Sequence, residues 1–196
     1  VAALLEVWPD AVKEKSSRGN TPLHIACINK APLEVVAALL NVWPDVAKEK
    51  DADGNIPLHA ACRNRALPLE VTTLLVNNWL SYKENRTNEA IMSSQTHTAR
   101  CTEHVEVLFS HLFALCNSDT LTHPPKEIMD YFIRIQLCNG VTLVLDRHPT
   151  LIPTVIKTMG LDTNVMADFL CTVGRCCNLT TMWEVIRNEQ DLLEGV

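Results

Sequence analysis

Three histidines and one cysteine near the middle of the chain have the types and spacing that could bind a metal ion. Cys101 and His104 follow His97 by four and seven residues, which would place the three side chains on one face of a helix, and His111 lies further on. Imidazole and thiolate are ligands that zinc prefers. The alternative is a polar loop and a helix that carry these residues by chance. Because no Cys-x-x-Cys pair supports a site, we predict no metal ligands and no cofactor.

A second cluster, Cys171, Cys176 and Cys177, lies near the end of the chain. Arg175 beside Cys177 would favour the nucleophilic thiolate form. Packing in the interior is the alternative, because free cysteines are among the most often buried residues. The chain has no nucleophile elbow, no phosphate-binding glycine-rich loop and no HExxH motif. We therefore predict no catalytic residues and no enzyme, with a metal- or thiol-dependent enzyme as the minor alternative.

Composition limits the classes of partner. The chain has 196 residues, of which 47% are hydrophobic, and a net charge of −6. The lack of a large basic face argues against nucleic acid as a partner. No apolar run reaches the roughly 18 residues that a membrane span needs. We expect no membrane insertion and no small-molecule substrate. Since the chain opens at Val1 within a helical pattern, we interpret it as a piece of a longer protein.

An internal repeat in the sequence identifies the helices and turns that would position any functional site. Residues 1–30 align with residues 36–65 without a gap, at a period of 35, and twenty of the thirty positions are identical. The shared positions include Cys27 and Cys62, each in a slot that suits a small buried side chain. Free thiols in such slots favour a reducing compartment, so we predict a cytoplasmic, intracellular protein.

One repeat unit is predicted to be a turn followed by two helices. Thr21 suits an N-cap, and the proline after it suits the first position of a short helix. We predict that Pro32 opens the second helix at its first position and that Trp43, which precedes a proline, ends it. Gly54 is predicted to supply a positive φ in the turn. Such a unit buries its apolar faces only when it is stacked on copies of itself.

These residues resemble the ankyrin repeat. The segment TPLHIAC (residues 21–27) fits the family motif in full, and IPLHAAC (residues 56–62) fits with isoleucine in place of threonine. The inter-helix glycine and the Gly-Ala after the second helix are replaced, which explains a period longer than the familiar 33. The resemblance implies an all-α solenoid of stacked helix-turn-helix units. It also implies that two histidines tie neighbouring loops together, within a structural set of Thr21, Pro22, Leu23, His24, Gly54, Pro57, Leu58 and His59.

The resemblance fades along the chain. A third unit begins at Pro68, and we predict ankyrin repeats in residues 1–90 and a divergent ankyrin-like or helical capping region in residues 91–196. A separate helical bundle is the alternative for the second part. Residues 86–90 are predicted to be a turn, residues 93–100 a loop, and the β-like run at residues 140–145 a helix by alignment.

The resemblance implies that the protein binds another protein, as a scaffold or adaptor, through turn tips and a concave helix face. A regulatory arm of a larger multidomain protein is the alternative. Lys30, Arg63 and Arg65 would form a small basic spot for an acidic segment, although solvated turn charges are the simpler interpretation. The predicted partner-binding residues are Arg18, Asn29, Lys30, Asp53, Arg63 and Arg65.

Overall fold

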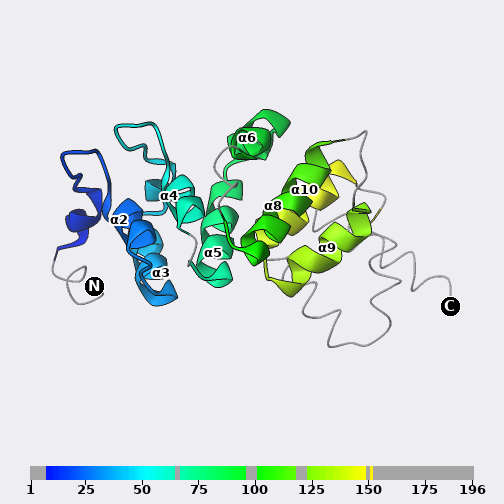
Figure 1. Cartoon of the computed structure of the whole chain (residues 1–196), viewed down its shortest axis with the longest axis horizontal. Coiled ribbons are helices and arrows are strands. Elements are labelled where there is room, and N and C mark those ends of the chain that lie inside the picture. Colours follow the sequence, from blue (N-terminus) through cyan, green and yellow to red (C-terminus); the bar gives the residue numbers. More distant parts are fainter. Residues whose placement is uncertain (1–7, 65–66, 96–100, 118–122, 149–150, 152–196) are drawn as a thin grey trace, which may run out of the picture. The chain divides into compact units, whose positions relative to one another are not determined.

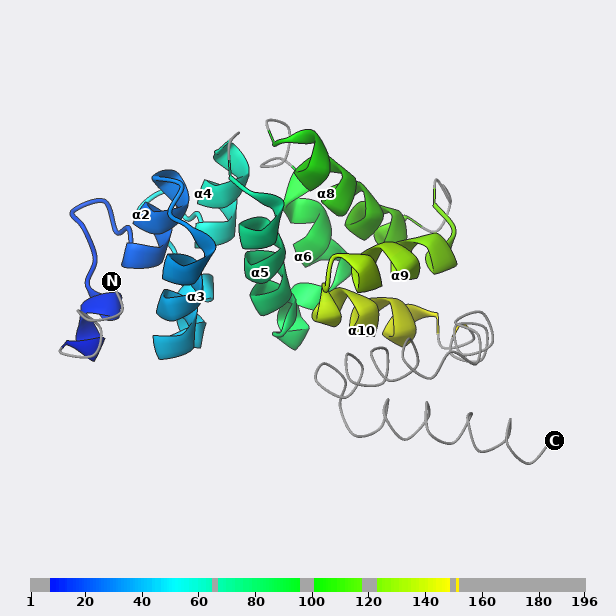
Figure 2. The ribbon, with the colours of Figure 1, turned by 90° about the horizontal axis from the view of Figure 1, so that it is seen from below.

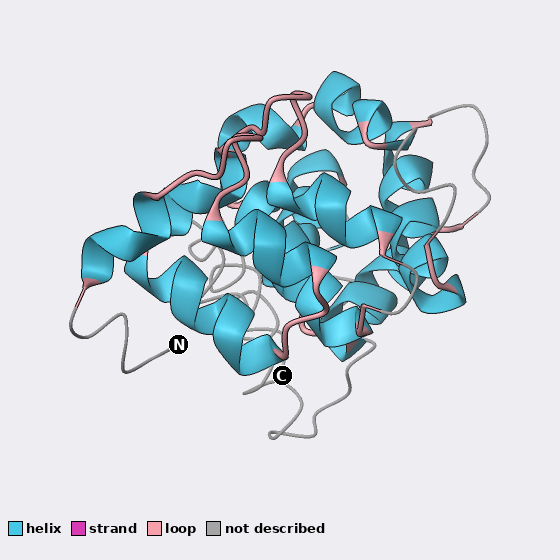
Figure 3. Ribbon diagram, turned by 60° about the vertical axis from the view of Figure 1, so that its left-hand side comes forward, coloured by secondary structure: helices cyan, strands magenta, loops and turns pink. Residues whose placement is uncertain are grey.

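The computed structural model describes residues 8–64, 67–95, 101–117, 123–148 and 151. In these ranges every regular element is a helix, with no strand, which confirms the all-α prediction (Figure 3). The chain forms two compact units, Val1–Phe113 and Ala114–Val196, and the boundary falls within helix α8 (Glu103–Cys116). The predicted division at residue 90 stays a prediction. None of the described helices is long and apolar enough to cross a membrane.

The first helix pair of the first unit follows the predicted pattern. Helix α2 (Pro22–Ile28) has Thr21 as its N-cap and a proline at its first position, as predicted. Lys30 then adopts a left-handed φ of 57° and turns the chain. Helix α3 (Leu33–Val42) ends before Trp43, also as predicted. The predicted start at Pro32 was one residue early, because this proline is the extended N-cap whose carbonyl accepts hydrogen bonds from Val35 and Val36.

The second helix pair repeats the first with one change. Helix α4 (Pro57–Arg63) corresponds to α2, and helix α5 (Leu69–Leu80) corresponds to α3. Helix α5 continues through Trp79, because leucine rather than proline follows this tryptophan. Leucine has the backbone N–H that a helix needs at this position, and proline lacks it. Trp79 is buried in the stack, whereas Trp8 is 52% exposed. The two tryptophans therefore have different environments, one at the surface and one in the core.

Short 3-10 helices, which the sequence analysis did not predict, follow the tryptophans. They are η1 (Pro9–Lys13), η2 (Pro44–Lys48) and η3 (Lys83–Arg86). The Tyr82 hydroxyl donates to Asp45 at 3.0 Å, and Lys48 Nζ lies 3.9 Å from the centre of the tyrosine ring. This contact joins the start of η3 to η2, so the linkers of consecutive units also contact each other.

The predicted turn at residues 86–90 was wrong in part. Helix α6 (Asn88–Ser93) begins inside it, and the Thr87 hydroxyl accepts a hydrogen bond from the Ala90 backbone N–H at 3.2 Å. A threonine N-cap starts a helix without the proline of the motif. Of the predicted loop at residues 93–100, Ser93 belongs to this helix, and residues 96–100 lie outside the described part.

The core of the first unit lies between the stacked helices. Helix α2 packs against α3 and α4, and α4 packs against α5, so the pairs succeed one another along the unit (Figure 1). Each short helix turns one face inward, and Leu23 and Leu58 are buried at equivalent positions. Cys27 and Cys62 are buried free thiols, as the repeat predicted. Burial between consecutive units is what makes one unit depend on the next.

The second unit contains helices α9 (Pro125–Arg134) and α10 (Cys138–Arg147), which lie side by side (Figure 2). Helix α9 begins at Pro125, with Pro124 as its N-cap. The run at residues 140–145 is fully buried within α10, so the helical prediction is confirmed over its β-like composition. Arg147 Nη1 donates to the carbonyl of Leu115 at 2.6 Å, which satisfies a backbone group near the C-terminal end of α8.

Candidate partner-binding surface

Two polar turns, the first tip (residues 16–20) and the second tip (residues 51–55), project before α2 and α4. In the second tip, the Asp51 carboxylate accepts the backbone N–H groups of Asp53 at 3.0 Å and Asn55 at 2.8 Å. The Ser16 hydroxyl fills the same role in the first tip, where it accepts from Arg18 and Asn20. Gly54 has the predicted positive φ, 81°, and Gly19 in the first tip has 73°. Both tips are therefore preformed by their own side chains.

The two tips are hydrogen-bonded to each other. The Ala52 backbone N–H donates to the Arg18 carbonyl at 3.0 Å, and Lys15 pairs with Glu49 at 2.7 Å beside them. A Cβ atom built on Gly19 would lie 2.9 Å from the Ala52 nitrogen. The tips thus pack too closely for a side chain at residue 19, and they form one surface.

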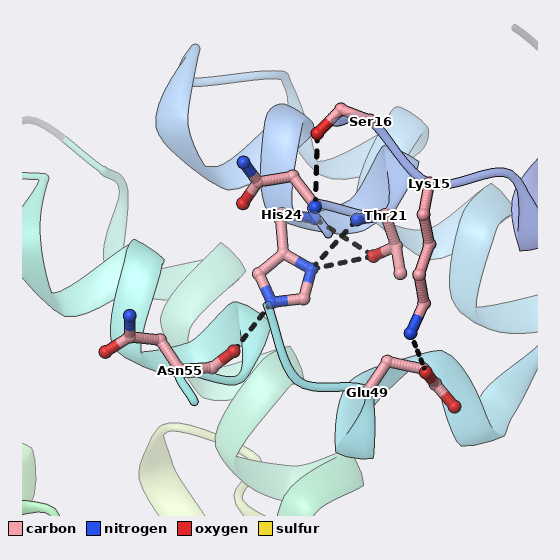
Figure 4. A network of polar contacts seen from close by, with 7 residues as sticks. Lys15, Ser16, Thr21, His24, Glu49 and Asn55 are labelled. Atoms are coloured by element: carbon pink, nitrogen blue, oxygen red, sulfur yellow. Dashed lines mark hydrogen bonds and ion pairs between the residues drawn. The ribbon is translucent and has the colours of Figure 1, made fainter. Parts of the chain in front are cut away.

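His24 fixes this surface from beneath (Figure 4). Its Nε2–H donates to the Asn55 carbonyl of the second tip at 2.9 Å, so Nδ1 is the unprotonated nitrogen. Nδ1 lies 3.2 Å from the Thr21 nitrogen and 2.8 Å from the Thr21 hydroxyl, which also accepts the His24 backbone N–H. Burial lowers the pKa of His24, because the charged imidazolium is disfavoured away from water. The imidazole is therefore a neutral structural link between units, as the resemblance implied.

His59 occupies the equivalent place in the next unit, but with a simpler cap. The Ile56 backbone N–H donates to His59 Nδ1 at 3.4 Å. Isoleucine has no hydroxyl, so the threonine part of the network is lost at this unit. The departure from the motif at residue 56 thus has a structural consequence.

A further link between units lies at the opposite ends of the short helices. Asn64 Nδ2 lies 2.9 Å from the Cys27 carbonyl and 3.0 Å from the Ile28 carbonyl. These carbonyls belong to the last turn of α2, which leaves such groups without partners inside the helix. This role of Asn64 was not predicted from the sequence. The signal was the asparagine shared by residues 29 and 64 in the alignment.

The structure places five of the six predicted partner-binding residues on the outside of the first unit. Arg18 and Asp53 are exposed on the tips, and Asn29 and Lys30 are exposed after α2. Arg63 is exposed at the end of α4, and its guanidinium donates to Asn55 Oδ1 at 3.1 Å. That bond directs the Arg63 charge back along α4 toward the second tip. The sixth residue, Arg65, lies outside the described residues.

Two exposed apolar residues also belong to this surface, and neither was among the partner-binding residues predicted from the sequence. Ile25 is 40% exposed and Ile28 is 49% exposed, and the two lie one turn apart on α2. The equivalent residues of α4 are Ala60 and Arg63. The inward positions within the two short helices are identical between the repeat units, whereas these outward positions differ. That difference between two aligned units is the signal that could have identified them.

The two clusters that suggested chemistry have different outcomes. In the part of the chain that the structure describes, no group of three or more His, Cys, Asp or Glu residues could hold a metal ion. His104 is exposed on α8, whereas His111 is buried, with Nδ1 2.7 Å from the Val107 carbonyl. Cys101 contacts α4 instead, with its sulfur 3.2 Å from the Cys62 carbonyl oxygen. The remaining residues of the clusters, His97, Cys171, Cys176 and Cys177, lie outside the described residues.

Comparison with known proteins identifies the repeat. Residues 1–88 match the family model for ankyrin repeats (3 copies). No curated protein and no solved structure matches the chain. Repeats of this family are in general protein-interaction modules and are in general not enzymes. The match ends at the first residue of α6.

Proposed function

We propose that residues 1–88, which are ankyrin repeats, act as a scaffold or adaptor that binds another protein through the outer face of the short helices and the two tips. The observation that carries this proposal is the exposed pair Ile25 and Ile28. Two large apolar side chains one turn apart lose contact with water when a partner covers them, and about 25 cal/mol is gained for each Å² of apolar surface buried.

The polar residues around this pair supply orientation. Lys30 lies two residues after Ile28 and is exposed, and Arg63 provides a second positive charge on the neighbouring helix. Charged side chains at the rim of an interface contribute more to association rate and specificity than to affinity. The preferred partner is therefore a protein segment with apolar side chains and a neighbouring acidic residue.

A rigid surface suits this role. Tips that are hydrogen-bonded to each other and to His24 lose little conformational entropy on binding. We therefore expect the partner to meet a surface that is already formed. The proposed place of action is the cell interior, because the buried thiols Cys27 and Cys62 serve the stack as free cysteines.

The test is affinity capture with the whole chain from an extract of the source cells, quantified by mass spectrometry. The Ile25→Asp/Ile28→Asp variant should lose the captured partner. Val42→Asp is the matched control, because Val42 is 42% exposed but lies at the end of α3. Circular dichroism checks that both variants are folded. A partner that both variants retain, or that both lose, would contradict the proposed surface.

A further inference from the structure

Cys62 and Cys101 bring two thiols together from distant parts of the sequence. Cys62 is buried in α4, and Cys101 is half-buried just before α8. The Cys101 thiol donates to the Cys62 carbonyl, with 3.2 Å between sulfur and oxygen. The proximity of the two thiols also shifts their pKa values in opposite directions. Both cysteines belong to the compact unit Val1–Phe113.

This contact corresponds to one made in the preceding unit. Cys62 is the repeat equivalent of Cys27, whose carbonyl accepts a hydrogen bond from Asn64 at 2.9 Å. Cys101 thus takes the place of an asparagine as the donor to the last turn of the preceding short helix. A thiol is the weaker donor of the two. Unlike an amide, however, it can be converted into a covalent link.

The two thiols differ in reactivity. A hydrogen bond from the Cys62 thiol lowers the pKa of Cys101, although burial acts in the opposite direction. The same hydrogen bond and burial raise the pKa of Cys62. The thiolate is the reactive form, so the more exposed Cys101 reacts first and Cys62 reacts second. Cys27, with no exposed surface and a pKa raised by burial to about 12, takes no part.

We propose that Cys62 and Cys101 are an oxidation site, at which a peroxide converts the pair into a reversible disulfide between α4 and the segment that leads into α8. In the first step the Cys101 thiolate attacks one peroxide oxygen, the O–O bond breaks, and the products are a sulfenic acid and hydroxide. In the second step Cys62 sulfur attacks the sulfenic sulfur and forms the S–S bond. Its proton leaves with the hydroxyl group as water. A small-molecule thiol reverses the bond by exchange.

The consequence of oxidation is that a covalent link joins α4 to the segment before α8, in place of the weak hydrogen bond from the Cys101 thiol to the Cys62 carbonyl. A disulfide that closes a long loop restricts the unfolded chain and raises the stability of the folded one. Oxidation would therefore fix the segment that leads into α8 on α4, while the exposed face of α2 stays unchanged.

The experiment exposes the whole chain to hydrogen peroxide, blocks free thiols with an alkylating agent and maps the peptides by mass spectrometry. We expect one linked peptide pair, Cys62 with Cys101, two hydrogen atoms lighter than the reduced pair, which a thiol reductant restores. The Tm of the oxidised protein should rise by several degrees. Cys138→Ser is the matched control and should form the same link.

Two variants separate the steps. Cys101→Ser keeps a hydroxyl donor for the Cys62 carbonyl, so it folds, and it should leave Cys62 reduced with no rise in Tm. Cys62→Ala should stop after the first step, so that a sulfenic-acid probe labels Cys101. The proposal is overturned if Cys62 in the wild-type protein stays open to alkylation after unfolding while Cys101 is oxidised to sulfinic acid, or if Cys101 pairs with another cysteine.

Discussion

Replacement of His24 by alanine should destabilise the first unit more than any exposed substitution. The change removes the donor to the Asn55 carbonyl and the acceptor for the Thr21 backbone N–H, both in a site with no exposed surface. A buried polar group left without a partner costs about 1–3 kcal/mol. Two such groups are left here, whereas the Thr21 hydroxyl still accepts the backbone N–H of residue 24. Including the cavity, we expect the free energy of unfolding to fall by about 3 kcal/mol or more.

Two further variants divide this cost between the two nitrogens of the ring. In His24→Asn the side-chain oxygen can take the place of Nδ1 and accept from Thr21. In His24→Gln the side-chain nitrogen can take the place of Nε2 and donate to Asn55. Each should recover about 1 kcal/mol relative to alanine, because each restores one hydrogen bond. The measurement is urea unfolding followed by circular dichroism, with the slope m compared between variants.

The control is Lys13→Ala, which removes an exposed pair with Asp10. Exposed ion pairs contribute about 0–1 kcal/mol, so this variant should unfold close to the wild type. A loss of under about 1 kcal/mol for His24→Ala would refute the argument that the ring links the units. Equal losses for the alanine, asparagine and glutamine variants would instead assign the cost to packing alone.

Two other perturbations test the same region. Burial lowers the pKa of His24 below its ordinary value of 6.5, so the unfolded chain takes up a proton there before the folded one does. The free energy of unfolding should therefore decline as pH falls below 6.5, by up to about 1.4 kcal/mol per pH unit. The decline should be smaller in His24→Gln, and urea unfolding at a series of pH values measures the decline in both proteins. Gly54→Ala should cost about 1–2 kcal/mol for its positive φ alone. Gly19→Ala should cost more by thermal unfolding, because its Cβ would also lie 2.9 Å from the Ala52 nitrogen, and equal costs would contradict that contact.

The helix pairs could be predicted because their signals are local. A threonine followed by a proline specifies the start of α2, and a residue before proline specifies the end of α3. Helix α3 ends before the tryptophan that precedes a proline. In α5 leucine follows the equivalent tryptophan, Trp79, and the helix therefore continues for two more residues. The duplication made the prediction of the helices easier, because a residue that recurs at the same position in both repeat units gives the same structural signal twice.

The contacts between units could not be predicted in the same way. Asn64 reaches carbonyl groups 36 and 37 residues earlier, and no local pattern specifies which backbone atoms a side chain meets at that distance. Arg63 was expected to share a small basic spot with Lys30 and Arg65, and its contact with Asn55 of its own repeat unit was not predicted. The direction of a long flexible side chain depends on its partners in space, so the sequence supplied its position and not its contact.

The way in which these units are tied together leaves the outer surface free to vary. Three side chains that link neighbouring elements end on backbone carbonyls: His24 on that of Asn55, Asn64 on those of Cys27 and Ile28, and Cys101 on that of Cys62. Every residue type has the same backbone carbonyl. These links therefore place no demand on the side chains of the residues that supply the carbonyls. The outward positions are likewise unused by the stack, and they differ between units, Ile25 against Ala60 and Ile28 against Arg63. Stability therefore depends on the inward motif, whereas the choice of partner depends on outward residues that can change without loss of the fold.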